Sequence, residues 1–346
     1  MTNAFNLRSS EQIHERWRRA ITEILVTGAT GYVGSAVVDA LGGAGHGVWG
    51  LARSDDSAEE LKRRGYAACP GDLKQPGSLS RAITRSRARA VVHAATTGDS
   101  EAESADRRAV EETLAALRGT RGVFVYTSGG WVMGNAPGSA EEPPADEDSP
   151  LEPAPSLRWR PAVEHRVLEA AAEHGVRALV VRPALVYGRG GGVVAELVDS
   201  ARERGAARYV VGEEPGSDPL WTLVHTSDLG DLYVRMLAAS GADASGGEVV
   251  IAAGTRPVPV REIAAEASRL HGSVGSGGEA EPWPLSQARR ELGEYADSLV
   301  LSQRLSDEKA RGRFGWQPSG PSVFEELARG SYAPDGSGAD ETGGRA

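Results

Sequence analysis

The chain has a single cysteine, Cys69, among its 346 residues. One cysteine cannot form an internal disulfide, so we expect a protein of the reducing cytoplasm. No apolar run is long enough to span a bilayer, and the N-terminus lacks an uninterrupted signal-peptide core. No cluster of cysteine and histidine has the ligand spacing of a zinc site, so no metal site is predicted.

Positive charge is also scarce. The 38 Lys and Arg residues are outnumbered by 48 Asp and Glu residues, which gives a net charge of −10. This balance argues against nucleic acid or an anionic membrane as a partner, and we interpret it as ordinary solubility. The expected partner is a small-molecule substrate. At 346 residues the chain can hold one large domain, or a domain plus a smaller lobe.

The most informative stretch that is present runs from residue 24 to residue 34. A short apolar strand pattern enters a turn with glycines at 28, 31 and 34, and a helical pattern of apolar residues begins at Val33. Gly28 permits a tight turn, Gly31 lets backbone approach a pyrophosphate, and Gly34 lets the helix pack close to the strand. The helix then points its N-terminal amides at the phosphates. We predict a dinucleotide cofactor at this turn, with a merely structural glycine turn as the alternative.

Apolar strand patterns alternate with helical patterns over the first half of the chain. We expect strands at 48–52, 67–70, 90–94, 123–127 and 178–182, and helices at 58–64, 77–86, 104–117 and from about 157. This alternation predicts an α/β fold with a doubly wound parallel sheet of the Rossmann type. Because ligands bind beyond the carboxyl ends of such strands, the informative residues should follow each strand. His93, which ends a buried strand, is expected to be a satisfied core histidine.

The chain is expected to divide into four parts. Residues 22–188 form the dinucleotide-binding core, and residues 189–332 form a smaller C-terminal substrate lobe with returning core elements. Residues 1–21 are an extension that could pack on the domain or on a second subunit of a homodimer, or be partly disordered. Residues 333–346 are predicted to be a disordered tail. The Gly-, Pro- and acid-rich segment 134–155 is expected to be a mobile surface loop where a substrate lid would sit.

Residues that follow the strands are the candidates for holding the cofactor. Arg53 comes first after the second strand and favours the 2′-phosphate of NADP, with NAD or a solvated arginine as alternatives. Asp72 could lie against the adenine ring, and Ala94 and Ala95 are small where the cofactor must pass. The predicted cofactor-binding residues are Gly28, Thr30, Gly31, Tyr32, Val33, Arg53, Asp72, Leu73, Ala94, Ala95, Thr127 and Pro183.

Six segments occur in the order that is typical of one superfamily. They are Thr27–Gly34, Gly71–Leu73, Val91–Ala95, Arg182–Gly188, Val224–Leu229 and Phe314–Pro318. On these segments the chain resembles the extended and atypical short-chain dehydrogenase/reductase superfamily, over roughly residues 22–330. The runs Asp106–Glu111 and Tyr126–Gly129 look closest to an atypical subgroup that is often labelled as epimerases or hydroxysteroid-dehydrogenase-like proteins. Such labels follow the fold and say little about the substrate.

The resemblance also implies a catalytic Ser or Thr after the fifth strand and a Tyr-x-x-x-Lys pair on the next helix. In that pair the lysine lowers the pKa of the tyrosine, which transfers the proton. Here, anchoring on Glu164 places Ser156 at the tyrosine position and Arg160 at the lysine position. Gly129 falls at the serine position, with Ser128 one residue before it. An arginine could bind the ribose or a phosphate, but it cannot tune a neighbour by changing its protonation.

Other residues must therefore supply the chemistry, and Ser128, Tyr187 and Arg160 are the catalytic candidates. Packing is the more favoured role for Tyr187, and serine alone is a poor acid at neutral pH. The candidate substrate residues are Trp131, Met133, Trp159 and Trp221. These large side chains indicate an apolar or aromatic substrate, unless they only fill core.

Three functions are consistent with these observations. We expect an NADP-dependent oxidoreductase or epimerase, with NAD as the alternative cofactor. It would act on a small, partly apolar or sugar-like carbonyl or hydroxyl substrate through a non-standard proton relay. One alternative is a redox-neutral isomerase, cyclase or dehydratase on the same fold. The other is a non-catalytic NADP sensor, which the missing Tyr–Lys pair favours.

Overall fold

A computed structural model describes residues 23–136, 142–214, 218–239, 247–273 and 278–334. The predicted N-terminal extension and all but the first two residues of the predicted tail lie outside the described residues. Five residues of the predicted loop 134–155, positions 137–141, also lie outside them.

The chain divides into two compact units. Unit 1 takes in the described parts of Met1–Tyr126, Val167–Leu179 and Tyr233–Gly247. Unit 2 takes in the described parts of Thr127–Arg166, Val180–Leu232 and Glu248–Ala346. Each unit thus collects segments from both sides of residue 188, and the predicted boundary there stays a prediction.

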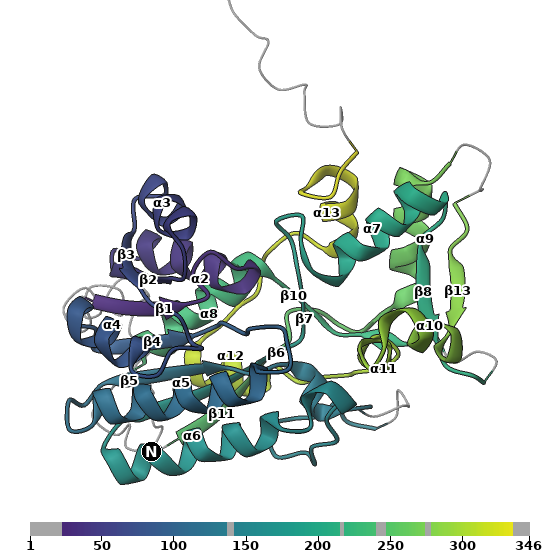
Figure 1. The fold of residues 1–346 in the computed structure, drawn as a ribbon. Helices are drawn as coiled ribbons and strands as arrows, with labels where there is room; N and C mark the ends of the chain where they lie inside the picture. Colours follow the sequence, from purple (N-terminus) through teal and green to yellow (C-terminus); the bar gives the residue numbers. More distant parts are fainter. Residues whose placement is uncertain (1–22, 137–141, 215–217, 240–246, 274–277, 335–346) are drawn as a thin grey trace, which may run out of the picture. The chain divides into compact units, whose positions relative to one another are not determined.

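A seven-stranded sheet has the strand order β11–β6–β5–β4–β1–β2–β3 (Figure 1). Its strands are β1 (Glu23–Thr27), β2 (Gly47–Ala52), β3 (Ala67–Pro70), β4 (Ala90–His93), β5 (Val123–Thr127), β6 (Arg177–Pro183) and β11 (Gly247–Ala252). Strand β1 pairs in parallel with β2 and with β4, so the strand order reverses there. The doubly wound α/β fold is confirmed, and a ligand is expected beyond the end of β1.

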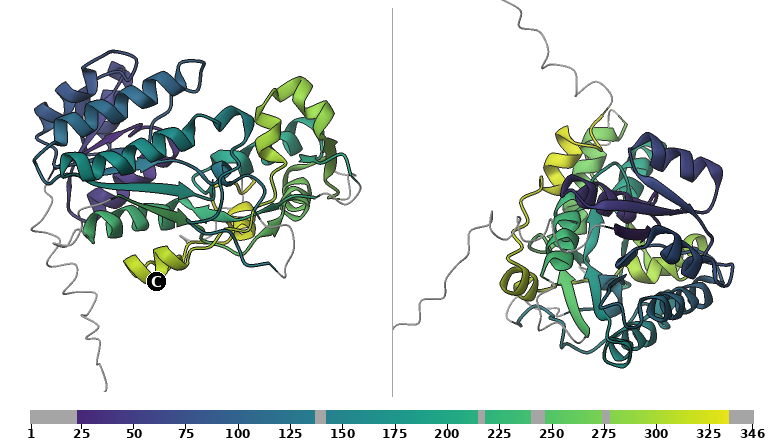
Figure 2. Two further views of the ribbon diagram at one scale, coloured as in Figure 1. Left: turned by 90° about the horizontal axis from the view of Figure 1, so that it is seen from below. Right: turned by 90° about the vertical axis from the view of Figure 1, so that its left-hand side faces the viewer.

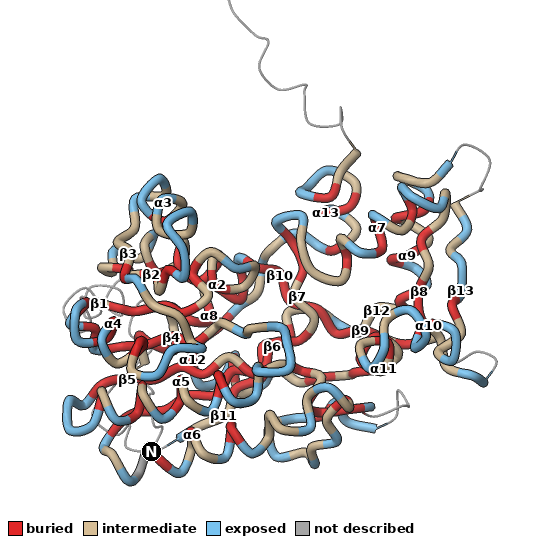
Figure 3. Tube along the Cα trace, viewed as in Figure 1, coloured by how far each residue is buried: buried red, intermediate tan, exposed pale blue. Residues whose placement is uncertain are grey.

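Residues 23–126, the first described part of unit 1, form four helices that follow its strands, drawn in purple to blue in Figures 1 and 2. They are α2 (Tyr32–Gly43), α3 (Asp55–Arg63), α4 (Ser78–Ser86) and α5 (Ala102–Leu117). Strands such as β1 are buried on both faces (Figure 3), which explains their continuous apolar sequences. Helix α3 begins three residues before its expected start because Ser54 and Ser57 form a capping box.

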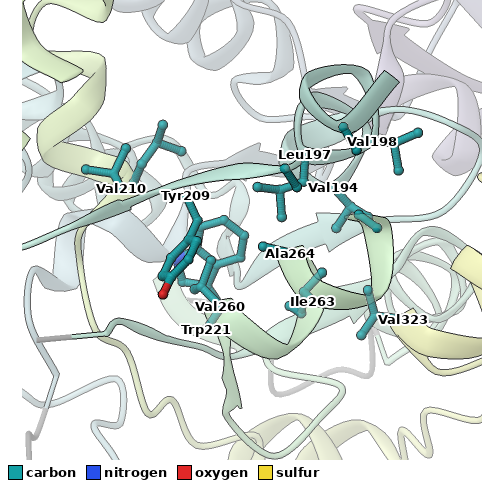
Figure 4. Close-up of a cluster of buried hydrophobic side chains, with 14 of the residues drawn as sticks. Val194, Leu197, Val198, Tyr209, Val210, Trp221, Val260, Ile263, Ala264 and Val323 are labelled. Carbon is teal, nitrogen blue, oxygen red and sulfur yellow. The ribbon is translucent and has the colours of Figure 1, made fainter. Parts of the chain in front are cut away.

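Unit 2 has shorter strands in two-stranded pairs. Pairing is parallel between β7 and β10 and between β8 and β13, and antiparallel between β9 and β12. The strands are β7 (Leu185–Tyr187), β8 (Arg208–Val211), β9 (Leu220–Trp221), β10 (Leu223–His225), β12 (Val258–Pro259) and β13 (Glu281–Pro284). A buried cluster that includes Val194, Tyr209, Trp221 and Ile263 forms the core of this region (Figure 4).

The remaining helices follow β5 in the chain. They are the short 3₁₀ helices η1 (Gly130–Met133) and η2 (Pro155–Leu157), and the α-helices α6 (Arg160–His174), α7 (Gly192–Arg204), α8 (Thr226–Ala238), α9 (Val260–His271), α10 (Leu285–Leu292), α11 (Tyr295–Leu299), α12 (Glu308–Phe314) and α13 (Val323–Arg329).

The described parts of the loop 134–155 are anchored, contrary to the expectation of a mobile lid. Ala136 forms an isolated β-bridge with Gln303, and Ala145 forms another with Leu305. Both alanines are buried. Backbone hydrogen bonds at these two bridges hold the segments on either side of positions 137–141 against other parts of unit 2.

Candidate functional site

The glycine turn in unit 1 has the geometry that its sequence predicts. Gly28 has φ +67°, and a Cβ there would lie 2.6 Å from the carbonyl oxygen of Ala94. A Cβ on Gly31 would lie 3.1 Å from the Gly28 carbonyl oxygen, and one on Gly34 would overlap that same oxygen. Close backbone contacts therefore require glycine at positions 28 and 34, and they leave little room for a side chain at position 31. Helix α2 starts directly after Gly31, and no side chain among the described residues caps it. Amides in such a first turn are suited to binding an anion.

The other predicted cofactor residues of unit 1 lie at the ends of neighbouring strands. Ala94 and Ala95 contact the turn at Gly28, so the structure brings these three residues together. Asp72 accepts a hydrogen bond from the backbone of Lys74 at 3.0 Å and thus stabilises its own turn. The Arg53 side chain is exposed just beyond β2, and it has no hydrogen-bond or ion-pair partner within the described ranges.

His93 is a satisfied core histidine, as predicted. Its Nδ1 lies 2.8 Å from Thr27 Oγ1, and its Nε2 lies 2.8 Å from Asp106 Oδ1. The hydroxyl of Tyr126 donates to the other carboxylate oxygen of Asp106. Sequence reasoning missed this buried network, although Asp106 and Tyr126 both belong to runs that carry the family resemblance. The network ties β1, β4, β5 and α5 together within unit 1.

In unit 2, Ser128 belongs to a buried charged network at the end of β5. Its hydroxyl donates to a carboxylate oxygen of Glu164. The guanidinium of Arg182 binds the same carboxylate, with Nη2 at 2.7 Å and Nε at 3.1 Å from Oε2. Glu164 is only 2% exposed and Arg182 4%, so the paired charges stabilise each other away from water. The sequence marked Glu164 only as an anchor for the helix and did not reveal this pairing.

Arg160 begins α6 and lies near the same strand end. Its Nη1 donates to the carbonyl oxygen of Thr127 at 3.3 Å, and its guanidinium lies 5.0 Å from the centre of the Trp159 ring. Its Nε is buried and has no hydrogen-bond acceptor in the described part of the chain. An unpaired buried donor costs about 1–3 kcal/mol. Thr127, Ser128 and Arg160 are therefore brought together, and one donor of Arg160 is left without an acceptor among the described residues.

Tyr187 lies elsewhere in unit 2 and has a partner already. Its hydroxyl donates to the carbonyl oxygen of Pro321 at 2.6 Å, and its ring packs edge-on against His225. Burial raises the pKa of Tyr187 well above its ordinary value, with the carboxylates of Asp228 and Glu326 adding to the rise. A tyrosine with this environment is a poor proton donor at neutral pH. The geometry favours the packing role for Tyr187.

The four predicted substrate residues have different contacts. The sulfur of Met133 contacts Arg182 at 3.3 Å, and Trp159 lies against Arg160. Trp131 packs edge-on against Tyr295, with ring centres 5.9 Å apart. Trp221 is 3% exposed and belongs to the buried cluster of Figure 4. Pro183, predicted to contact cofactor, places its carbonyl oxygen against Gly130 in η1.

Within the described ranges, no group of three or more His, Cys, Asp or Glu residues could hold a metal ion. None of the helices in those ranges has the length and the apolar composition that crossing a membrane requires.

Comparisons with known proteins agree with this architecture. A family model described as the NAD dependent epimerase/dehydratase family matches residues 24–252. The chain is 30% identical to the uncharacterized protein YLL056C of Saccharomyces cerevisiae, over 90% of this chain and 99% of that protein. It is 31% identical to a 2-alkyl-3-oxoalkanoate reductase of Stenotrophomonas maltophilia, over 89% and 98% of the two chains.

A solved structure shows the same fold at lower sequence identity. The UDP-glucose 4-epimerase of Thermus thermophilus, in complex with NAD, aligns with a TM-score of 0.70 and 20% identity. The alignment covers 90% of this chain and 97% of that one. At this identity the likeness concerns the fold alone.

Proposed function

The chain belongs to the NAD dependent epimerase/dehydratase family, and from this premise we propose that it is a nicotinamide-dependent carbonyl reductase. The proposed substrate is a small, partly apolar or sugar-like ketone, and the proposed cofactor is NADP(H), with NAD(H) as the alternative. The reductase relative, which matches over 98% of its length, supports reduction over epimerisation.

The residues of unit 1 fit a dinucleotide. A side chain at Gly31 would fill the space against the Gly28 carbonyl where backbone must approach a pyrophosphate. Exposed Arg53 has free donors for a 2′-phosphate, which favours NADP(H). When bound, the reduced nicotinamide supplies a hydride to the carbonyl carbon of the substrate.

The observation that carries the proposal is the Ser128–Glu164–Arg182 network beside Arg160. Because the Ser128 hydroxyl donates to Glu164, its oxygen is oriented to accept a hydrogen bond from water. In the proposed relay this water protonates the alkoxide oxygen of the reduced substrate, and the resulting hydroxide leaves to solvent. The buried Nε–H of Arg160 stabilises the alkoxide while the arginine keeps its own proton.

The test follows the absorbance of the reduced nicotinamide ring while the protein is incubated with NADPH and a panel of ketones. Ser128→Ala and Arg160→Met should each lower kcat about a hundredfold, a typical loss for one group of a proton relay or oxyanion site. Cofactor affinity should change little for Ser128→Ala. If cofactor binding is lost in step with activity, these residues are packing elements and the relay is wrong.

Tyr187→Phe provides the matched comparison. If Tyr187, one of the catalytic candidates, supplied the proton, turnover would fall in this variant. The Tyr187 hydroxyl instead donates a hydrogen bond to the Pro321 carbonyl oxygen. Because the variant loses only this bond, we expect an unchanged kcat and a free energy of unfolding that is lower by about 1 kcal/mol. If NADPH binds but no ketone oxidises it, the sensor or the redox-neutral enzyme replaces the reductase as the proposed function.

A further inference from the structure

Unit 2 contains a pocket that the proposed relay does not use. Its volume is about 500 Å³, and residues of α7, β8, β9, β13, α10 and α11 line it. Much of the lining is uncharged and buried, including Leu197, Val210, Trp221 and Trp283. Figure 4 shows Leu197, Val210 and Trp221 in one buried cluster. An apolar lining around a pocket of this size suits the body of a small organic ligand.

Two buried donors in this lining have no acceptor. Trp221 is 3% exposed and Trp283 is 9% exposed, and neither indole N–H has a hydrogen-bond acceptor among the residues the structure describes. Nearly all buried polar groups in proteins are hydrogen-bonded, so two such donors in the lining of one pocket call for an explanation. An indole N–H only donates. The missing partner is therefore a hydrogen-bond acceptor, which a ligand can bring.

Arg208 adds a third donor, and its position limits what a ligand can contact. Its Nε is buried, lies 3.6 Å from Glu281 and has no hydrogen-bond acceptor in the described part of the chain. Its guanidinium stacks 3.9 Å from the centre of the Trp283 ring. This stacking uses a face of the indole and leaves the N–H at the edge of the ring unpaired.

The carboxylates that line the pocket occupy exposed positions. They are Glu196, Asp199, Glu203 and Glu291. Arg204, the second lining arginine, has its Nη2 3.9 Å from Glu291. Four carboxylates against two arginines leave an excess of negative charge, which disfavours a phosphate or a carboxylate as the source of the acceptor. The acceptor oxygen then belongs to an uncharged group.

The two tyrosines of the lining contribute rings, since both of their hydroxyls already donate. The Tyr295 hydroxyl donates to Glu196 at 2.8 Å, and the Tyr209 hydroxyl donates to Asp218 at 3.1 Å. With the two tryptophans, they make four aromatic residues in the lining. Aromatic side chains pack well against other flat rings. The lining therefore favours an aromatic body for the ligand.

We propose that this pocket binds an uncharged aromatic compound through an oxygen acceptor, to which the indole N–H groups of Trp221 and Trp283 donate. A carbonyl oxygen has two lone pairs and can accept from both groups. Both N–H groups are covered in the structure, so neighbouring side chains must move when the ligand enters. Such side-chain rearrangement is common on binding.

The inference rests on the proposed function in one respect, because it takes the bound compound to be the ketone substrate. Tyr295 of the pocket lining packs against Trp131, which lies three residues after Ser128. The carbonyl that is reduced belongs beside Ser128 and Arg160, so the tryptophans hold a different oxygen of the same substrate. The substrate class is then an aromatic ketone with a second uncharged oxygen.

The experiment compares two isosteres by isothermal titration, in the absence of any nicotinamide cofactor. 1-Tetralone carries a carbonyl oxygen beside an aromatic ring, and 1-methylidenetetralin replaces that oxygen with a CH₂ group. The ketone should bind about fivefold more tightly, the scale of one net hydrogen bond. Trp283→Phe keeps an aromatic ring and removes the N–H, so the preference for the ketone should fall to about twofold or less.

Trp49→Phe is the matched control. It removes an indole N–H of unit 1 that already donates to Glu23, so the preference for the ketone should stay at about fivefold. A second measurement needs no variant and therefore holds even if Trp283→Phe fails to fold. In protein with isotope-labelled tryptophan, the indole N–H resonances of Trp221 and Trp283 should shift more with 1-tetralone than with the hydrocarbon. The Trp49 resonance should not move.

Two outcomes would overturn the inference. One is equal binding of the ketone and its hydrocarbon isostere, or binding of neither. The other is tighter binding of protonated 1-aminotetralin or of UDP than of 1-tetralone, because either would place a charged group in the pocket. Since no cofactor is present, a clear preference for 1-tetralone without any ketone reduction would contradict the proposed function and leave the pocket assignment standing.

Discussion

The two units differ in where their predicted function resides. In unit 1 it resides in the backbone, since Gly28 and Gly34 admit no side chain without a contact that is too close. In unit 2 it resides in side-chain charge, since Ser128, Glu164 and Arg182 form a buried hydrogen-bonded network. A backbone site tolerates changes in the side chains around it, whereas a charged network depends on every member. The cofactor part of this fold can therefore persist while the proton chemistry changes.

The largest effect is expected when a charge is removed from the Ser128–Glu164–Arg182 network of unit 2, which tests whether that network depends on every member. Glu164→Gln leaves the guanidinium of Arg182 buried without a counter-charge, so stability should fall by about 3–5 kcal/mol. Chemical denaturation would measure the loss. Asp307→Asn is the matched control, because its pair with Arg311 is a partly exposed (i, i+4) pair that should matter by less than about 1 kcal/mol. Equal losses in the two variants would contradict the account of the network.

The second prediction addresses unit 1. Gly31→Val places a branched side chain 3.1 Å or less from the Gly28 carbonyl, where a pyrophosphate must approach the backbone. NADP affinity should fall about a hundredfold or more, with the fold retained. The control is Gly43→Val, at the far end of the same helix, where the new side chain has open space around it. This variant should bind NADP with the affinity of the wild-type protein. Fluorescence titration measures the NADP affinity of both variants. An undiminished NADP affinity in Gly31→Val would show that the glycine turn is not a dinucleotide-binding motif.

The smallest expected effect concerns cofactor choice. Arg53→Ala should weaken NADP about tenfold and leave NAD nearly unchanged, because only NADP offers a 2′-phosphate to a charge-assisted contact. Arg63→Ala, an exposed arginine at the end of α3, is the control and should affect neither cofactor. Equal weakening of both cofactors, or of neither, would show that Arg53 is merely solvated and would make NAD as good a candidate.

Much of unit 1 could be predicted because local patterns specify it. Strands β3 and β5 occupy the residues expected for them, and the glycines follow β1 as the dinucleotide motif requires. The start of α3 was missed because the capping box of Ser54 and Ser57 extends the helix beyond its apolar pattern. The burial of His93 was predicted correctly, yet its partner Asp106 lies thirteen residues away and no local pattern names it.

The site in unit 2 could be predicted only in part. Ser128 and Arg160 stand out by their place in the family pattern; Ser128 follows β5, and Arg160 begins α6 and donates to the carbonyl of Thr127. The pairing of Glu164 with Arg182 joins a helix to a strand eighteen residues later, and only the tertiary fold creates such a contact. Tyr187 stayed a catalytic candidate beside its favoured packing role, because no local pattern shows that Pro321 accepts its hydroxyl.

The central claim is that this protein reduces a carbonyl without a Tyr–Lys pair, and transfer of a label tests it most directly. The protein is incubated with NADPH that carries deuterium at the reactive position of its ring, together with a panel of ketones that includes aromatic ketones. The account predicts one deuterium on the carbinol carbon of the product, in the wild-type chain with Ser156 and Arg160 unchanged. Tight binding of the labelled cofactor, with no deuterium found in any product, would contradict it.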